Sequence, residues 1–156
     1  MRQKLPILLL VLALFITGCS SAVRYSTSSV PPKNPAPEVA FNPADYADAE
    51  VLEEVSGKAS FYADKFHGKL TANGEVFDMY KISAAHPKYP LETIIRVTNL
   101  KNRKSVILRI NDRMPDFKGR IIDLSYQTAV ELEMLKEGVA DVKIEVLEWG
   151  KGKTVK

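Results

Sequence analysis

The chain has 156 residues, 46% of them hydrophobic, and its 22 basic residues face 19 acidic ones. Arg2 and Lys4 belong to an N-terminal segment that we expect to be removed. The remaining chain then has 20 basic and 19 acidic residues and is nearly neutral. Nothing in this balance suggests nucleic-acid binding, which requires a net basic face. One cysteine and two histidines, without an H-E-x-x-H motif or a glycine-rich phosphate loop, predict no disulfide, no metal site and no cofactor.

Residues 1–18 have the pattern of a secretory signal, in which two basic residues are followed by a short apolar run. The run is too short for a comfortable membrane span. It ends in I-T-G-C, which resembles a bacterial lipobox and implies cleavage before Cys19 and a lipid on its sulfur. Since Ser20 and Ser21 follow, rather than aspartate, the resemblance favours an outer-membrane lipoprotein facing the periplasm. A plain cleaved signal is the alternative.

Residues 19–54 are rich in serine and proline and show few large apolar side chains. Such a composition cannot bury enough surface to offset the entropy of ordering the chain. We therefore expect a lipidated cysteine and a flexible tether, with at most a short helical turn near residues 45–54. As a coil the tether would span roughly 30–35 Å, and stretched it would reach about 110 Å.

Residues 55–150 form one predicted domain, with residues 151–156 as a tail. Alternating apolar patterns predict short strands at 57–62, 81–85, 93–99, 105–111, 121–124 and 140–147. Residues 100–104 interrupt two of them with Asn102 and three basic residues, which is typical of an exposed hairpin turn. These patterns predict a mostly β fold, a small closed barrel of six strands, although periodicity cannot give the strand order.

One helix is expected after the fifth strand. Ser125 suits its N-cap, since a serine hydroxyl accepts a hydrogen bond from an amide of the first turn. The apolar side chains that fall on one helical face are Tyr126, Ala129, Val130 and Met134. Gly138 follows, and we expect it to provide the left-handed C-terminal cap.

Three ionisable side chains stand beside predicted turns or strand ends: Glu75, His86 and Asp112. Glu75 follows an Asn-Gly turn signal, which would hold its carboxylate at a loop tip. His86 and Asp112 each end a predicted strand. Partial burial of Asp112 would favour the protonated carboxyl that an acid catalyst needs. This grouping predicts an acid/base site built by a small β domain.

Several sequence blocks occur in a fixed order through the domain. They are A-S-F-Y at 59–62, F-H-G-K-L-T-A-N-G-E at 66–75, S-A-A-H at 83–86, P-L at 90–91, R-V-T-N-L at 96–100, N-D-R at 111–113 and G-R-I-I-D-L-S at 119–125. Together they resemble the catalytic domain of the rare lipoprotein A (RlpA)-like family, a double-psi β-barrel. The resemblance implies an endolytic peptidoglycan lytic transglycosylase that acts in wall remodelling or septal separation.

The implied reaction breaks the bond between N-acetylmuramic acid and N-acetylglucosamine, preferably in strands stripped of stem peptides. The 6-hydroxyl of the muramic acid attacks its own anomeric carbon, so that the product carries a 1,6-anhydro end and no water is added. One carboxyl can then serve first as acid and later as base, and Asp112 is the residue expected to do so. The alternative is that Asp112 pairs with Arg109 or Arg113 to fix a turn.

The resemblance also assigns catalytic roles to His86 and Glu75. His86 would orient or polarise Asp112, or bind the sugar, whereas a lone histidine is otherwise more often structural. Glu75 would contact substrate or stabilise the cationic transition state, the alternative being a surface glutamate. Substrate-binding roles are expected for His67, Thr71, Asn73, Asn111 and Arg113, although His67 would equally serve as a turn cap.

Three positions depart from the family pattern. Met114 and Glu92 stand where glycine is usual, and Pro87 follows His86 where a basic residue is common. Loss of glycine matters if the backbone needs a positive φ. The chain ends at Lys156, which leaves no room for the C-terminal SPOR domain of many relatives, so septal targeting is not expected from this sequence.

Two other functions fit the same residues. One is a wall-binding lipoprotein without catalysis, as in expansin-like relatives of this barrel. The other is an inverting glycoside hydrolase, in which Asp112 would work with Asp64 or Glu75 across a water molecule. The ends of the product distinguish them: anhydro ends for the transglycosylase, no new ends for the binder, and reducing ends for the hydrolase. Peptidoglycan glycan strands are the expected partner, and a tethered monomer is the default.

Overall fold

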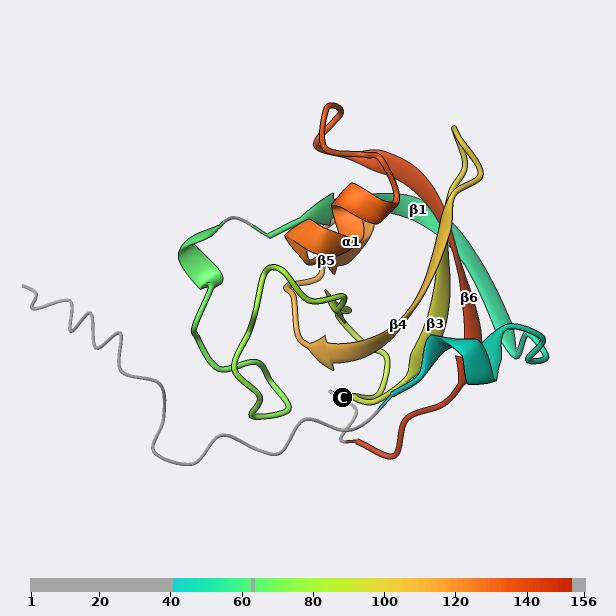
Figure 1. The fold of residues 1–156 in the computed structure, drawn as a ribbon, viewed down its shortest axis with the longest axis horizontal. Helices are drawn as coiled ribbons and strands as arrows, with labels where there is room; N and C mark the ends of the chain where they lie inside the picture. Colours follow the sequence, from blue (N-terminus) through green and yellow to red (C-terminus); the bar gives the residue numbers. More distant parts are fainter. Residues whose placement is uncertain (1–40, 63, 153–156) are drawn as a thin grey trace, which may run out of the picture.

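In a computed structural model, which describes residues 41–62 and 64–152, six strands close into a barrel (Figure 1). The predicted signal, Cys19, most of the tether and residues 153–156 lie outside the described residues. The strands are β1 (Glu53–Phe61), β2 (Ala84–Ala85), β3 (Ile94–Asn99), β4 (Ser105–Asp112), β5 (Arg120–Leu124) and β6 (Ala140–Glu148). The mostly β barrel with one short helix is therefore confirmed.

The order around the barrel is β1-β5-β2-β4-β3-β6, which the sequence could not give. Two neighbouring pairs, β1 with β5 and β2 with β4, are parallel, and the other pairs are antiparallel. The parallel pair of β2 and β4 brings Ala85 opposite Asp112. This pairing carries the residue after β2, His86, to the end of β4, where the predicted acid/base site lies.

The barrel interior is apolar. Val142, Ile144 and Val146 are fully buried along β6, and Ile95 and Val97 lie opposite them on β3, as the alternation predicted. Successive strand residues point to opposite faces, so this period of two creates one continuous core. β3 and β4 form the expected hairpin, whose turn carries exposed basic side chains.

The helix α1 (Tyr126–Glu131) begins where predicted, with the Ser125 hydroxyl accepting a hydrogen bond from Thr128 N. It ends earlier than predicted, because Glu133, with φ of 52°, takes the left-handed conformation directly after it, whereas Gly138, with φ of 70°, lies further along the chain. Glu133 N donates to Val130 O and Met134 N donates to Ala129 O, which is a Schellman motif. The predicted glycine cap is wrong, since these bonds satisfy the last carbonyls first.

β2 is shorter than the strand expected at residues 81–85. Ser125 N donates to Ser83 O, and Ser83 N lies within hydrogen-bonding distance of the hydroxyls of Ser125 and Thr128. The backbone of Ser83 is thus bonded to the start of α1 rather than to a strand. This contact ties the helix to the segment that leads into the site.

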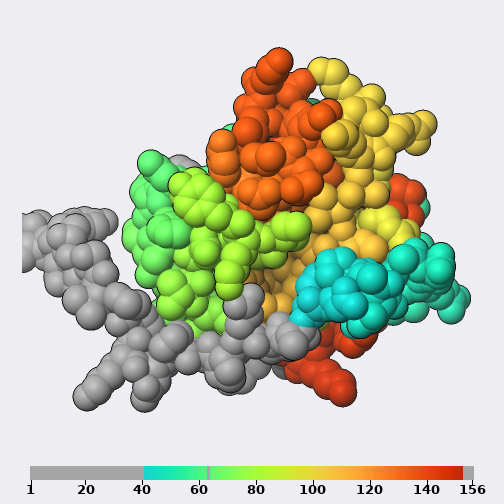
Figure 2. All heavy atoms as spheres, in the orientation of Figure 1, coloured from blue at the N-terminus to red at the C-terminus, as the bar shows by residue number. Residues whose placement is uncertain are grey.

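The folded domain begins before the predicted boundary at residue 55. β1 starts at Glu53, and the 3₁₀ helix η1 (Pro43–Tyr46) packs on β4. Arg96 donates to the carbonyl of Ala47, and the Tyr46 hydroxyl donates to Glu148 at 2.7 Å. Residues 41–54 (cyan in Figure 2) therefore lie along the barrel and not in a free tether. Within the described residues no helix has the length and apolar character needed to span a membrane.

Candidate active site

Asp112 is the last residue of β4, and three donors hold its carboxylate. The backbone amides of Ala72 and Arg113 both donate to Oδ1, each at 2.8 Å. The Tyr62 hydroxyl donates to Oδ2 at 3.1 Å. Because amide hydrogens cannot turn and a hydroxyl can, a proton on this carboxyl is best carried by Oδ2, with Tyr62 then accepting.

The loop that supplies Ala72 is a tight turn, as the Asn-Gly signal predicted. Gly74 has φ of 92°, a conformation that is easy only for glycine. Thr71 N donates to Glu75 O at 2.9 Å, and Asn73 N donates to Asn111 O at 3.2 Å. These bonds fix the 71–75 loop against the end of β4 and so aim Ala72 N at Asp112.

Glu75 is buried, with 6% of its surface exposed, and not at the exposed loop tip that the sequence suggested. Both of its carboxylate oxygens accept from Arg109, at 2.8 and 3.0 Å, and Oε2 also accepts from Asn111 at 3.1 Å. Burial, the largest single influence, raises the pKa of Glu75. The Asn111 hydrogen bond together with the charge and hydrogen bond of Arg109 outweighs it, so the pKa falls below its usual value. Glu75 is thus a paired carboxylate at neutral pH.

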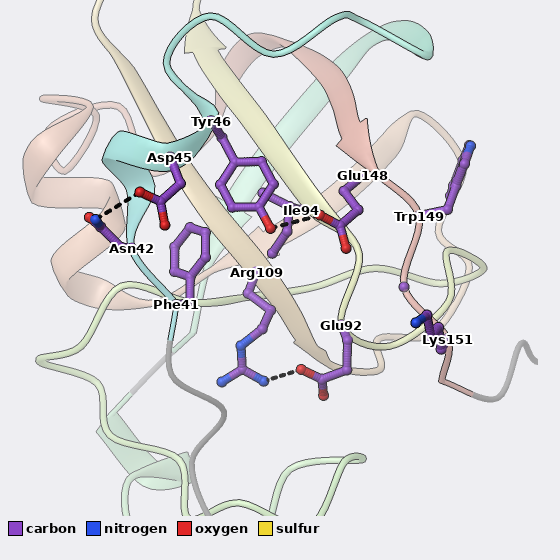
Figure 3. Close-up of a pocket in the computed structure, with 11 residues that line it drawn as sticks. Phe41, Asn42, Asp45, Tyr46, Glu92, Ile94, Arg109, Glu148, Trp149 and Lys151 are labelled. Carbon is purple, nitrogen blue, oxygen red and sulfur yellow. Dashed lines mark hydrogen bonds and ion pairs between the residues drawn. The ribbon is translucent and has the colours of Figure 1, made fainter.

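Arg109 binds a second carboxylate, that of Glu92, at 2.6 Å through its other terminal nitrogen (Figure 3). The Asn73 amide donates to the same Glu92 side chain at 2.9 Å, which joins the 71–75 loop to the turn before β3. Glu92 has φ of 73°, and the Thr93 N to Pro90 O hydrogen bond makes it the third residue of a β-turn. A type II turn favours glycine at this position. The backbone at Glu92 therefore does have the positive φ for which family members use glycine.

Met114 behaves differently from Glu92. It is not among the described residues with positive φ, so its backbone makes no demand for glycine. Its side chain is 5% exposed and is packed against the protein rather than projecting from it. The two departures from the family pattern thus have different structural consequences.

His86 is a buried, neutral imidazole. Its Nδ1 accepts hydrogen bonds from Lys88 N at 3.1 Å and Tyr89 N at 2.8 Å, so the ring proton lies on Nε2. Burial, and then the positive charges of Arg113 and Lys88, lower the pKa of His86 to about 4. The ring stacks on Tyr89 with 3.7 Å between centroids. Nε2 is therefore the nitrogen that can donate a hydrogen bond.

His86 meets Asp112 through the backbone. His86 N donates to Asp112 O at 3.3 Å, and no hydrogen bond among the described residues joins the His86 ring to the Asp112 carboxylate. The Arg113 guanidinium lies 3.5 Å from the carbonyl of His86 and 3.4 Å from that of Asp112, and so connects the ends of β2 and β4. The direct polarisation of Asp112 by the histidine ring is not the arrangement in this structure.

Besides Arg113, the predicted substrate-binding side chains divide into two groups. Thr71, Asn73 and Asn111 use their polar atoms to support the loop: the Thr71 hydroxyl donates to Asn73 at 2.6 Å, and Asn111 donates to Glu75. His67 lies outside this network and accepts from Met79 N at 3.2 Å, the turn-capping role weighed above. The buried Oδ1 of Asn111 has no hydrogen-bond partner among the described residues.

Sequence reasoning gave Arg109 and Glu92 no catalytic or binding role and favoured core packing for Tyr62 over stacking on a sugar, although all three belong to the site. Tyr62 packs edge-on against Phe77 and at a tilt against Phe66, and its hydroxyl reaches Asp112. Burial, and then the charge and hydrogen bond of Asp112, raise the pKa of Tyr62, so it remains a hydroxyl donor. Tyr62 follows β1, which is parallel to β5, and this position indicates a place in the site only once the order of the strands is known.

No group of three or more histidine, cysteine or acidic side chains is placed to hold a metal within residues 41–62 and 64–152. What the arrangement offers is a carboxyl held by three donors, a neutral imidazole and a buried ion pair. Such a set can transfer a proton and support charge that develops nearby.

The lytic transglycolase family model matches residues 54–144, more than half of the chain and nearly all of the barrel. The chain belongs to the lytic transglycolase family. The double-psi β-barrel expected from the sequence blocks is thereby confirmed.

Relatives within this family are named endolytic peptidoglycan transglycosylase RlpA. The protein of that name from Vibrio cholerae is 52% identical over 92 residues, which cover 59% of this chain and 35% of that protein. The one from Campylobacter jejuni is 36% identical over 157 aligned positions, covering 88% of this chain and 57% of that protein. The chain thus spans about a third of the length of the first relative and over half of the second.

Solved structures support the fold of this lytic transglycolase domain. Streptomyces papain inhibitor is similar over its whole length and over 65% of this chain, with a TM-score of 0.53 at 22% sequence identity. At that identity the likeness concerns the barrel and not its chemistry.

Proposed function

We propose that this chain is an endolytic peptidoglycan transglycosylase that leaves 1,6-anhydro-N-acetylmuramic acid ends. The observation that carries the proposal is the family match over residues 54–144, together with 52% identity to a relative named for that activity. The site chemistry agrees with it, because one carboxyl can serve first as acid and then as base, and the hydroxyl partner of Asp112 Oδ2 can accept a hydrogen bond as well as donate one. Glycan strands without stem peptides are the proposed substrate.

In the proposed reaction Asp112 Oδ2 gives its proton to the glycosidic oxygen as the bond to the muramic anomeric carbon breaks. The 6-hydroxyl of the same sugar then attacks that carbon, and its proton passes to the Asp112 carboxylate, so that no water is consumed. The Tyr62 hydroxyl stays bonded to Oδ2 through both steps by turning between donor and acceptor. His86 is proposed to donate from Nε2 to the sugar, and Glu75 to hold Arg109 and Asn111 in place.

The test uses the purified protein with peptide-stripped peptidoglycan strands and product analysis by mass spectrometry. Ends with 1,6-anhydro-N-acetylmuramic acid are expected, and Asp112→Asn should lower their rate of formation about 100-fold or more, the scale of general acid catalysis. Thermal unfolding of the variant should stay cooperative. Reducing ends would instead identify a hydrolase, and glycan binding without new ends would identify a wall-binding protein. Turnover by the asparagine variant at the normal rate would remove Asp112 from its role.

We also propose that the chain is lipidated at Cys19 and displays its domain, as a monomer, from the outer membrane into the periplasm. The support is the I-T-G-C ending of the apolar run and the serines after it. Several acyl chains, each contributing about 0.8 kcal/mol per buried methylene, would anchor such a protein stably. Globomycin should make an unprocessed precursor accumulate, whereas unchanged processing would contradict the anchor.

A further inference from the structure

A pocket of about 330 Å³ lies beside the candidate active site, between η1, the turn before β3 and the chain after β6 (Figure 3). Its volume falls within the range of small-ligand sites. Its principal side chains are the aromatic rings of Phe41, Tyr46 and Trp149 and the charged groups of Glu92, Arg109 and Glu148. Aromatic faces next to carboxylate and guanidinium groups suit a ligand that is apolar on one side and hydroxylated at its rim, as a sugar ring is.

Two side chains of this pocket connect directly with the site. Arg109 binds Glu75 with one terminal nitrogen and Glu92 with the other. Trp149 packs edge-on against Tyr89, with 5.2 Å between centroids, and Tyr89 stacks on His86. A ligand in the pocket would therefore contact Arg109, which binds Glu75, and Trp149, which reaches the His86 ring through Tyr89.

Glu92 occupies a turn position that favours glycine or asparagine, since φ is 73°. Its backbone is nevertheless held firmly, because Glu92 N donates to Ile110 O at 2.8 Å. Strained residues of this kind persist where the surrounding structure fixes them, and they concentrate at functional sites. Glycine would adopt this turn without strain, so the turn itself does not require the Glu92 side chain. The carboxylate instead accepts hydrogen bonds from Arg109 and Asn73.

The second carboxylate on Arg109 changes what the pocket can bind. With Glu75 alone, Arg109 would form a neutral ion pair, and its second terminal nitrogen would keep its hydrogen-bond donors for a ligand in the pocket. With Glu92 in place, both terminal nitrogens are paired, and the pocket is lined by three carboxylates, on Asp45, Glu92 and Glu148, against Arg109 and the exposed Lys151. An anionic group entering it would meet like charge, which discriminates strongly between otherwise similar ligands.

We propose that this pocket is a subsite for a neutral N-acetylhexosamine, and that Glu92 determines its specificity by excluding sugars that carry a carboxylate. The proposal rests on the proposed function, since it assumes a glycan substrate. It assigns N-acetylglucosamine, rather than N-acetylmuramic acid with its lactyl carboxylate, to the position beside Arg109.

The experiment uses Trp149, the only tryptophan of the chain, as a reporter inside the pocket. The full-length protein in mild detergent is titrated with N,N′-diacetylchitobiose, which is neutral, and with N-acetylmuramic acid, while indole fluorescence and the indole N–H resonance are followed. We expect the neutral sugar to bind at least about fivefold more tightly, and Glu92→Gly to bring the two affinities within about twofold of each other.

Glu148→Gln is the matched control. It removes the same charge from the same pocket, but Glu148 bonds to Tyr46 and not to Arg109, so most of the preference should survive. An indole signal that responds to neither sugar, a preference for the anionic sugar in the unmodified protein, or an unchanged preference in Glu92→Gly would each overturn the proposal. No bond is cleaved in these titrations, so their failure would overturn the subsite and leave the transglycosylase proposal standing. Sugar binding without anhydro products would overturn the transglycosylase proposal and leave the subsite standing.

Discussion

The two faces of β4 differ in what stabilises them. Leu108 and Ile110 point into the barrel and are fully buried among apolar side chains. Arg109 and Asn111, which alternate with them, are also buried, yet they lie in a polar network with Glu75 beneath the 71–75 loop. One strand therefore has an apolar side that closes the barrel and a charged side that builds the site.

The contrast shows where the domain is vulnerable. Apolar burial has no direction, so a core responds gradually to lost volume. A buried charge needs its partner, because removing one member of the pair leaves the other without solvent and without compensation. Substitutions on the charged face of β4 should thus lower the free energy of unfolding more than those on the apolar face.

The largest effect is expected from Arg109→Met, which removes the guanidinium that the carboxylates of Glu75 and Glu92 share. Since Arg109 and Glu75 are both about nine-tenths buried, the variant should lose about 3–5 kcal/mol of unfolding free energy, measured by urea denaturation. Adding Glu75→Gln to it should recover part of the loss, because the uncompensated charge is then removed.

Lys104→Met is the control for charge removal at an exposed pair, the one between Lys104 and Glu133. It should change the stability by less than about 1 kcal/mol. Equal losses of stability in Arg109→Met and Lys104→Met would show that burial does not decide how much an ion pair contributes.

A somewhat smaller effect is expected from pH. The pKa of His86 is about 4 in the folded domain and 6.5 in an unfolded chain, so the unfolded state binds the proton first as the pH falls. Stability contributed by the neutral ring is complete above pH 6.5 and is lost as the pH falls from 6.5 to 4, by about 3 kcal/mol in total. Denaturation at a series of pH values measures this slope.

His86→Gln should flatten that slope between pH 6.5 and 4, since the titrating group is gone. Glu75 contributes a separate dependence of the same sign at lower pH, because its lowered pKa means that stability falls as the carboxylate becomes protonated. A slope that persists unchanged in the glutamine variant would assign the pH dependence to other groups.

The smallest effect is expected on the apolar face. Ile95→Val removes one methylene from the barrel interior and should cost about 0.5–1.5 kcal/mol. The rate of glycan cleavage per folded molecule should be unchanged, because the core cluster does not contact the Asp112 carboxylate. A loss of activity larger than the loss of folded protein would mean that the barrel interior and the site are coupled.

The regular parts of the fold were predictable because their signals are local. Alternation along β3 and β6 gave the buried faces, the Asn-Gly pair gave the turn before Glu75, and Ser125 gave the helix start. Asp112 at a strand end followed from the same pattern. In each case the physical cause lies within a few residues of its effect.

The remaining features depend on partners far apart in the sequence. Arg109 and Glu75 are 34 residues apart, and Tyr46 reaches Glu148 across 102, so neither composition nor period reveals them. Residues 41–54 looked like tether for that reason. Glu92 and Glu133 take left-handed conformations that local preference assigns to glycine, because the surrounding hydrogen bonds outweigh it.

The barrel closes between its first and last strands, since β1 pairs along its length with β6, residues 53–59 against 140–146. No intermediate length of chain can form this seam. A chain made or threaded from its N-terminus thus keeps β1 without its antiparallel neighbour until residues 140–146 have emerged. Folding dominated by such distant pairings is slow, on the order of milliseconds to seconds. Loss of even the final strand would leave an open sheet edge, and with it a surface for aggregation or proteolysis.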